Sequence, residues 1–163
     1  MEVSGVVSGG GMTVTSAAIV QNVVKDIRSF LQSNLTDPKS GTRTSSKWVL
    51  LNRPDYPVEY PTIVIDHIGG SDSWGSIGTE YKQVNLRVGI EVWTNSTSQR
   101  DLVWDDVYDE LRTHFTTADT GGRSITGYGI SDMIMLNCFN VDQPEEKMHR
   151  KVSSWSVKYY ATT

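Results

Sequence analysis

The chain has 163 residues, of which 37% are hydrophobic and 21% charged, as in ordinary globular proteins. This length fits one domain, which buries a core without a disulfide or metal staple. The formal net charge of −4 argues against a protein that grips nucleic acid, since phosphate binding needs concentrated Lys and Arg, but leaves open one that lets nucleic acid pass.

Residues 1–12 carry a glycine triplet and no hydrophobic period, which predicts a flexible N-terminal arm ahead of a single domain at 13–163. An amphipathic helix is expected from about Thr15 to Leu35, where Asp37-Pro38 ends it. Its apolar side chains share one face at helical spacing: Ile19, Val20, Val23, Val24, Ile27, Phe30, Leu31 and Leu35. A single broad apolar face predicts that the helix packs on a sheet.

Two strands are expected next, on either side of a proline-rich segment. KWVLL at 47–51 is the first, and TIVIDHI at 62–68 is the second. Prolines at positions 54, 57 and 61 exclude a helix or a central strand from 52–61, because proline lacks the ladder N–H. The unbroken Ile63-Val64-Ile65 run indicates burial on both faces of a sheet.

The glycine-rich stretch IGGSDSWGSIG, residues 68–78, is expected to be a hairpin loop. A phosphate cradle needs glycines that lead directly from a strand into a helix N-terminus. The glycines here instead lie between two strands, and their spacing does not fit G-x-G-x-x-G. Trp74 at a polar loop tip is typical of a contact anchor, unless it folds back onto its own domain.

The clearest strand covers Val84–Val92, where apolar residues alternate with Gln83, Asn85, Arg87, Gly89 and Glu91. One of its faces packs on helices, and the other meets water or a partner. A second amphipathic helix is expected from about Ser98 to Thr116, with Ser98 and Asp101 forming a start that resembles a capping box. Its apolar face comprises Val103, Trp104, Val107, Tyr108, Leu111 and Phe115.

Two closing strands are expected at 129–141 and 151–161, joined across 142–150 as a long hairpin. The element order is therefore helix, strands, helix, strands, with mostly hairpin connections. This order predicts an α+β fold, in which a mixed or antiparallel sheet carries both amphipathic helices on one face.

The spacing of the reactive residues predicts no catalytic residue, no metal and no cofactor. The three histidines, His67, His114 and His149, are scattered and form no H-x-x-x-H or H-E-x-x-H pair. Cys138 stands alone in an apolar run, which indicates a buried packing residue. No apolar run approaches the ~18 residues of a membrane span, and the missing basic region at the start gives no reason to expect a signal peptide.

Two charged clusters need a separate interpretation. The polar side of the second helix is acidic: Asp101, Asp105, Asp106, Asp109 and Glu110. A solvated face or a subunit contact is favoured there over a cation site. KMHRK, residues 147–151, is the only basic cluster, and it is either a solvated hairpin tip or a hairpin that docks on an acidic face such as the second helix of a neighbour.

Over residues 13–162 the chain resembles the tail terminator proteins of long-tailed viruses of bacteria and archaea. The resemblance lies in element order and hydrophobic pattern: the first helix, the YPTIVIDHI lead into a strand, a glycine-containing hairpin, VNLRVGIEVWTNSTSQ feeding the helix RDLVWDDVYDELRTHF, and two strands that end in WSVKYYATT. It implies a hexameric ring that caps the tail tube, stops tube polymerisation and joins the tail to the neck. It implies no chemistry.

The resemblance also implies partners and a place in the virion. The partners are other copies of the chain, the tail tube protein and neck or connector proteins, in a virion assembled in the host cytoplasm and without a membrane. Genomic DNA passes through the ring without specific binding. Ring closure is a heterologous contact, with surfaces from the polar face of Val84–Val92, the 68–78 loop and the 142–151 hairpin. Within these surfaces we expect five contact residues: Trp74, Arg87, Glu91, Lys147 and Arg150.

Two alternatives stay open. Within the same class, the chain is another neck or head–tail completion protein, or a subunit that resembles the tail tube. From a different class, it is a small ligand-binding or enzymatic α+β domain with a pocket between its sheet and its helices.

Overall fold

The structure, a computed structural model, describes residues 20–21, 23–74, 81–116 and 130–162. The arm expected at 1–12 and the start of the first helix lie outside these ranges. The first helix covers residues 20–21 and 23–34. The elements that follow are η1 (Ser45–Lys47), β1 (Val49–Leu51), β2 (Thr62–Trp74), β3 (Tyr81–Thr94), α2 (Thr97–Thr116), β4 (Ile130–Gln143), η2 (Pro144–Glu146) and β5 (Met148–Thr162).

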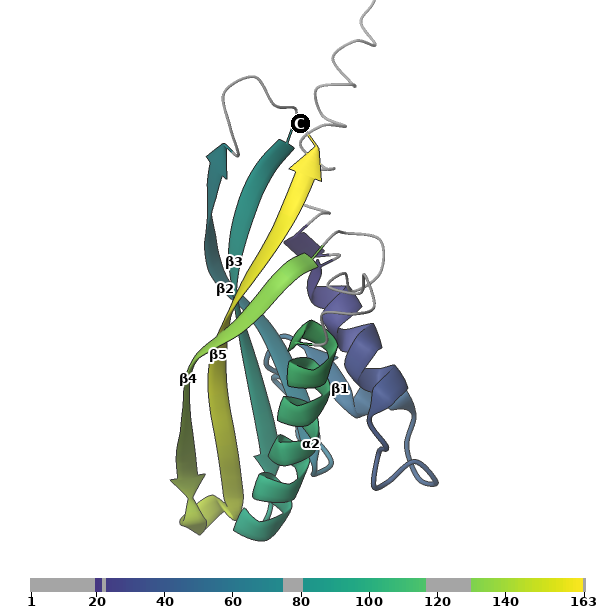
Figure 1. The fold of residues 1–163 in the computed structure, drawn as a ribbon. Helices are drawn as coiled ribbons and strands as arrows, with labels where there is room; N and C mark the ends of the chain where they lie inside the picture. Colours follow the sequence, from purple (N-terminus) through teal and green to yellow (C-terminus); the bar gives the residue numbers. More distant parts are fainter. Residues whose placement is uncertain (1–19, 22, 75–80, 117–129, 163) are drawn as a thin grey trace, which may run out of the picture.

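The strands form one five-stranded sheet in the order β1-β2-β3-β5-β4. β1 runs parallel to β2, and the other three pairings are antiparallel, so the sheet is mixed. The first helix and α2 both lie on the same side of the sheet (Figure 1). The expected α+β class, the mixed sheet and the placement of two helices on one face are confirmed.

We call the side of the sheet covered by the helices the inner face, and the opposite side the outer face. The core lies between the inner face and the two helices, and its fully buried members include Val23, Ile27, Leu31, Ile63, Ile65, Val88, Ile90, Val92, Val107, Leu111 and Val157. The alternation seen in the sequence of β3 sets this arrangement, because successive side chains point to opposite faces. Val64 belongs to the outer face but is also fully buried. This agrees with the burial on both faces that the unbroken Ile63-Val64-Ile65 run predicted.

The 68–78 loop prediction was wrong for residues 68–74, which continue β2 as far as Trp74. The register shifts between His67 and Gly69, and pairing with β3 then resumes from Gly69 opposite Arg87. At Gly70 the glycine reflects close strand approach and not a turn. A Cβ on Gly70 would lie 2.7 Å from the backbone oxygen of Asn85, which only glycine avoids. Residues 75–80 lie outside the described part of the chain.

Two expected boundaries also moved. The cap of α2 is Ser96 and not Ser98, since the helix begins at Thr97 and the Gln99 amide donates to Ser96 Oγ at 3.3 Å. The final hairpin is tighter than 142–150, because β4 runs to Gln143 and β5 resumes at Met148. Between them, η2 and Lys147 in a left-handed conformation (φ 50°) complete the turn.

A buried ion pair holds the segment that follows the first helix against the core. Arg43 donates to both Asp37 carboxylate oxygens at 2.8 and 2.7 Å, and its guanidinium lies 5.1 Å from the centre of the Trp48 ring. Burial raises the pKa of Asp37, but the bonds from Arg43 and from the Lys39 amide outweigh burial and leave this pKa below its ordinary value. Arg43 also donates to the Glu59 carbonyl, so one side chain joins two parts of the crossover to β2.

Replacing Arg43 with methionine should lower the free energy of unfolding by about 3–5 kcal/mol, because the Asp37 carboxylate is then buried without its partner. Urea denaturation followed by circular dichroism measures this. Lys39→Gln is the matched control: its ion pair with Glu59 is exposed at 3.5 Å and is expected to contribute less than about 1 kcal/mol. Equal effects of the two changes would contradict the assigned role of the buried pair.

The same pair predicts a pH dependence. Because folding depresses the pKa of Asp37, its contribution is present above the unfolded pKa of about 3.9 and is lost as the pH falls through the folded value. Asp37→Asn should therefore flatten the fall in stability below about pH 4 relative to the unmodified protein. An unchanged acid limb in denaturant titrations at several pH values would contradict this.

Candidate interaction surfaces

The five predicted contact residues do not form one patch. Arg87 lies on the outer face of β3 and is exposed. Glu91 and Arg150 lie further along the same face, where Glu91 pairs with Val152 and Arg150 with Trp93. Lys147 is exposed at the turn of the β4–β5 hairpin. Trp74 ends β2, and its side chain lies outside the described part of the structure.

Glu91 is the centre of a polar cluster on the outer face. Only 4% of its surface is exposed, although it belongs to the face without helices. Its Oε1 accepts from Arg53 Nε at 3.0 Å and from the Arg53 Nη2 group, while its Oε2 accepts from Trp93 Nε1 at 2.7 Å. Both oxygens of Glu91 are therefore bonded within the chain.

Two further charges complete this Glu91 cluster. Arg150 approaches Glu91 Oε2 at 3.6 Å and stacks on the Trp93 ring at 5.6 Å from its centre. Asp66 lies 3.7 Å from Arg53, and burial together with the Glu91 charge raises the pKa of Asp66. Arg150 thus serves the fold of its own chain, and the cluster joins β2, β3 and β5 with the segment after β1.

A second cluster anchors the β4–β5 hairpin to the start of α2. Arg100, which is 5% exposed, donates to Asp101 at 2.9 Å and to Asp142 at 2.7 Å. His149 bonds Asp142 at 3.0 Å and lowers the pKa of that carboxyl, with Arg100 adding to the effect. Lys151 approaches Asp101 at 3.6 Å.

These contacts change the interpretation of KMHRK. Three of its four basic side chains are engaged within the chain, by Asp142, Glu91 and Asp101 respectively. Only Lys147 projects from the turn, beside the exposed Glu145 and Glu146. The local sequence showed the basic cluster but not the carboxylates, which come from other strands and from α2.

The outer face also carries apolar side chains that the sequence analysis did not single out. Ile68, Ile134, Leu136 and Phe139 are 58%, 49%, 46% and 52% exposed. A shallow hollow lies between Ile68 on β2 and Leu136 on β4, with Arg87 and Ser156 between them. β4 is an edge strand, and its outer face meets no other element of the described chain, which leaves its apolar side chains there exposed.

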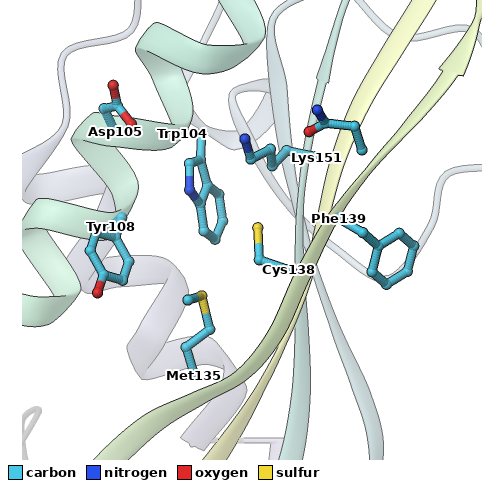
Figure 2. Close-up of a pocket in the computed structure, with 8 residues that line it drawn as sticks. Trp104, Asp105, Tyr108, Met135, Cys138, Phe139 and Lys151 are labelled. Carbon is cyan, nitrogen blue, oxygen red and sulfur yellow. The ribbon is translucent and has the colours of Figure 1, made fainter.

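The inner face of β4 borders a cleft against α2 (Figure 2). Trp104 and Tyr108 on the helix face Met135 and Cys138 on the strand, with Asp105 and Lys151 at the rim, while Phe139 points away from the cleft. Cys138 is half-buried, and burial raises the pKa of its thiol, which nearby Lys151 only partly opposes. The thiol is therefore protonated near neutral pH, which suits packing better than nucleophilic attack.

The described residues contain no group of three or more His, Cys, Asp or Glu side chains placed to hold a metal ion. His67 is exposed on β2, His149 is bonded to Asp142, and the side chain of His114 lies outside the described part of the structure. Among the described helices, none is both long and apolar enough to span a membrane.

No protein-family model and no curated protein matches the sequence. The structure is similar to a chain of a solved particle described as "Virion of native gene transfer agent (GTA) particle". The TM-score is 0.57 at 12% sequence identity, and the match covers 83% of this chain and 92% of the other. At this identity the likeness shows a shared fold, and it extends over nearly the whole of both chains.

Glu91 and Arg87 are expected to differ sharply in their effect on stability, although they occupy the same face of the same strand. Glu91→Gln should lower the free energy of unfolding by about 2 kcal/mol, because the amide cannot serve both Arg53 and Trp93 as the carboxylate does. Arg87→Gln should change it by less than about 0.5 kcal/mol, since its side chain is exposed. Denaturant unfolding of the two variants side by side checks this, and equal losses would contradict the assignment.

Proposed function

We propose that this protein is a structural subunit of a phage-like particle, and specifically a tail terminator. The observation that carries the proposal is the fold shared with a chain of a gene transfer agent virion over 83% of this chain and 92% of that one. The element order supports the finer assignment. Helix, three strands, α2 and a closing pair of strands follow one another as the resemblance to tail terminators implied.

In this proposal six copies form a ring at the end of the tail tube. The ring stops tube polymerisation, contacts the tube protein on one side and offers neck or connector proteins a surface on the other. DNA passes through its channel, and the net charge of −4 disfavours adhesion of the phosphate backbone. The protein then acts in the virion, at the junction of tail and neck, through shape and contact and without catalysis.

The available surfaces fit this mechanism. The outer face of the sheet carries no helix within the described chain, while α2 presents exposed carboxylates on the opposite side of the molecule. A heterologous ring needs two different surfaces on opposite sides of each subunit. A neck protein or a tube-like subunit would use similar surfaces, so position in the particle separates these assignments.

The cleft between α2 and β4 supports a second candidate, a small-ligand site. Its aromatic floor of Trp104 and Tyr108 and its charged rim of Asp105 and Lys151 are the ingredients of such sites. This candidate requires a monomer that retains a bound small molecule and loses it on Lys151→Met. Native mass spectrometry of the purified protein compares the two candidates in one experiment.

The terminator proposal predicts rings. Native mass spectrometry should show a species of six times the 18.1 kDa subunit mass, and negative-stain microscopy should show rings with a central channel. Coexpressed with the tube protein of its own genome, the chain should yield capped tubes, and its omission should yield overgrown ones. A chain that remains monomeric alone and is missing from tube ends would contradict the proposal.

A further inference from the structure

The outer face of the sheet forms a shallow trough between two apolar walls. Ile68 on β2 is one wall, and Leu136 with Phe139 on β4 is the other. The strands between them contribute Gly89 opposite Ser154 and Arg87 opposite Ser156, and all of these except Arg87 are small. We call the surface made by these seven residues the outer trough.

The width of the outer trough suits a single helix. β2 and β4 are separated by β3 and β5, hence by three strand spacings of about 4.8 Å, or about 14 Å in all. An α-helix with its side chains is about 10–12 Å across. Gly69 and Gly70 line the hollow beside Arg87 and contribute no side chains to it, whereas Ile68 lies over Gly89, where a Cβ would meet Ile68 Cδ1 at 3.1 Å.

Arg87 gives the trough a positive charge. Its side chain is exposed, and among the described residues it has no ion pair. The neighbouring charges of Arg53, Glu91 and Arg150 are engaged with one another. An occupant with carboxylates at its centre and an apolar side chain at its margin would complement this surface.

The exposed side of α2 has these properties. Leu102, Asp106 and Asp109 follow one another at i, i+4 and i+7 and therefore share one helix face, with Asp105 beside it. Leu102 is 65% exposed, and the three aspartates are exposed and without ion pairs among the described residues. The other side of α2 packs on β3, β5 and β4, so this acidic face points away from the sheet.

We propose that α2 of one copy of this chain docks in the outer trough of the next copy. The two surfaces lie on opposite sides of the sheet, so the contact is heterologous and repeats from copy to copy until the ring closes. A two-fold contact of trough against trough is disfavoured, because it would bring the Arg87 side chains of both copies together without a carboxylate. This inference rests on the proposed ring and identifies the surfaces that build it.

Cross-linking tests the contact directly. With Cys138→Ala as background, a chain carrying Leu102→Cys and Leu136→Cys should give, with a short bismaleimide, a covalent ladder that ends at the hexamer. Ser46→Cys with Leu136→Cys is the matched control, because Ser46 is exposed but belongs to η1 and not to α2; it should give no ladder. Rings that form without any α2–β4 cross-link would overturn the inference and leave the ring proposal standing.

A charge exchange between Arg87 of the outer trough and Asp106 of α2 tests whether these two side chains meet in the contact. Arg87→Asp alone, and Asp106→Arg alone, should each raise the concentration needed for half-assembly by about 30-fold, the loss expected for a central contact residue. The double variant should recover most of that loss, because the charges are reversed together. Arg87→Gln, which is expected to keep stability, should give an intermediate effect.

The outcomes separate the candidate occupants. Single variants that assemble as the unmodified protein does would overturn the inference. So would variants that form normal rings but no longer bind tube ends, since the trough would then hold the tube protein. A chain that never forms rings, in solution or on tubes, would instead remove the proposed function and the inference together.

Discussion

The structure depends on one constraint: two helices cover a five-stranded sheet on one face only. The inner face is closed by apolar packing, but the outer face must be stabilised without a second layer. It is stabilised around Glu91, whose carboxylate binds Arg53 and Trp93 and attracts Arg150. Arg53 reaches both Glu91, which lies opposite the fully buried Val64, and Asp66, two residues further along β2. At this end of the outer face, ion pairs and hydrogen bonds stabilise the sheet, whereas the packing of the helices stabilises its inner face.

The sequence predicted what depends on local periodicity. The two helices, the alternation along Val84–Val92 and the double burial of Ile63-Val64-Ile65 follow from side-chain spacing, and the structure confirms them. The loop predicted at 68–78 was wrong for residues 68–74 for a physical reason. Glycine is common both in turns and where strands approach closely, and only the position of β3 distinguishes the two at Gly70. The α2 cap moved for a similar reason, because Ser96 and Ser98 are both suitable caps and the end of β3 decides between them.

Candidate contact residues were harder to predict, because their partners are remote in sequence. Glu91 and Arg150 form one cluster only when β3 and β5 pair, and Arg53 joins it from the segment after β1. The charged side chains of Glu91 and Arg150 suggested, from the sequence alone, an exposed contact surface. The exposure of Leu136 and Phe139 likewise depends on the fold, because it follows from the position of β4 at the sheet edge. Arg87 is the residue whose exposure the alternation indicated and the structure confirms.

In the proposed ring, the division of the outer face into apolar and charged parts limits which partners can bind. Exposed apolar surface attracts unspecific partners when it is large and continuous. Here it is divided, because Arg87, Ser154 and Ser156 separate Ile68 from the apolar side chains of β4. A lone subunit therefore exposes small apolar patches around a charge, which hydrophobic contact alone does not cover well. Only an occupant with a carboxylate at the right place satisfies Arg87 while it buries both walls, so the charge that limits unspecific association also selects the partner.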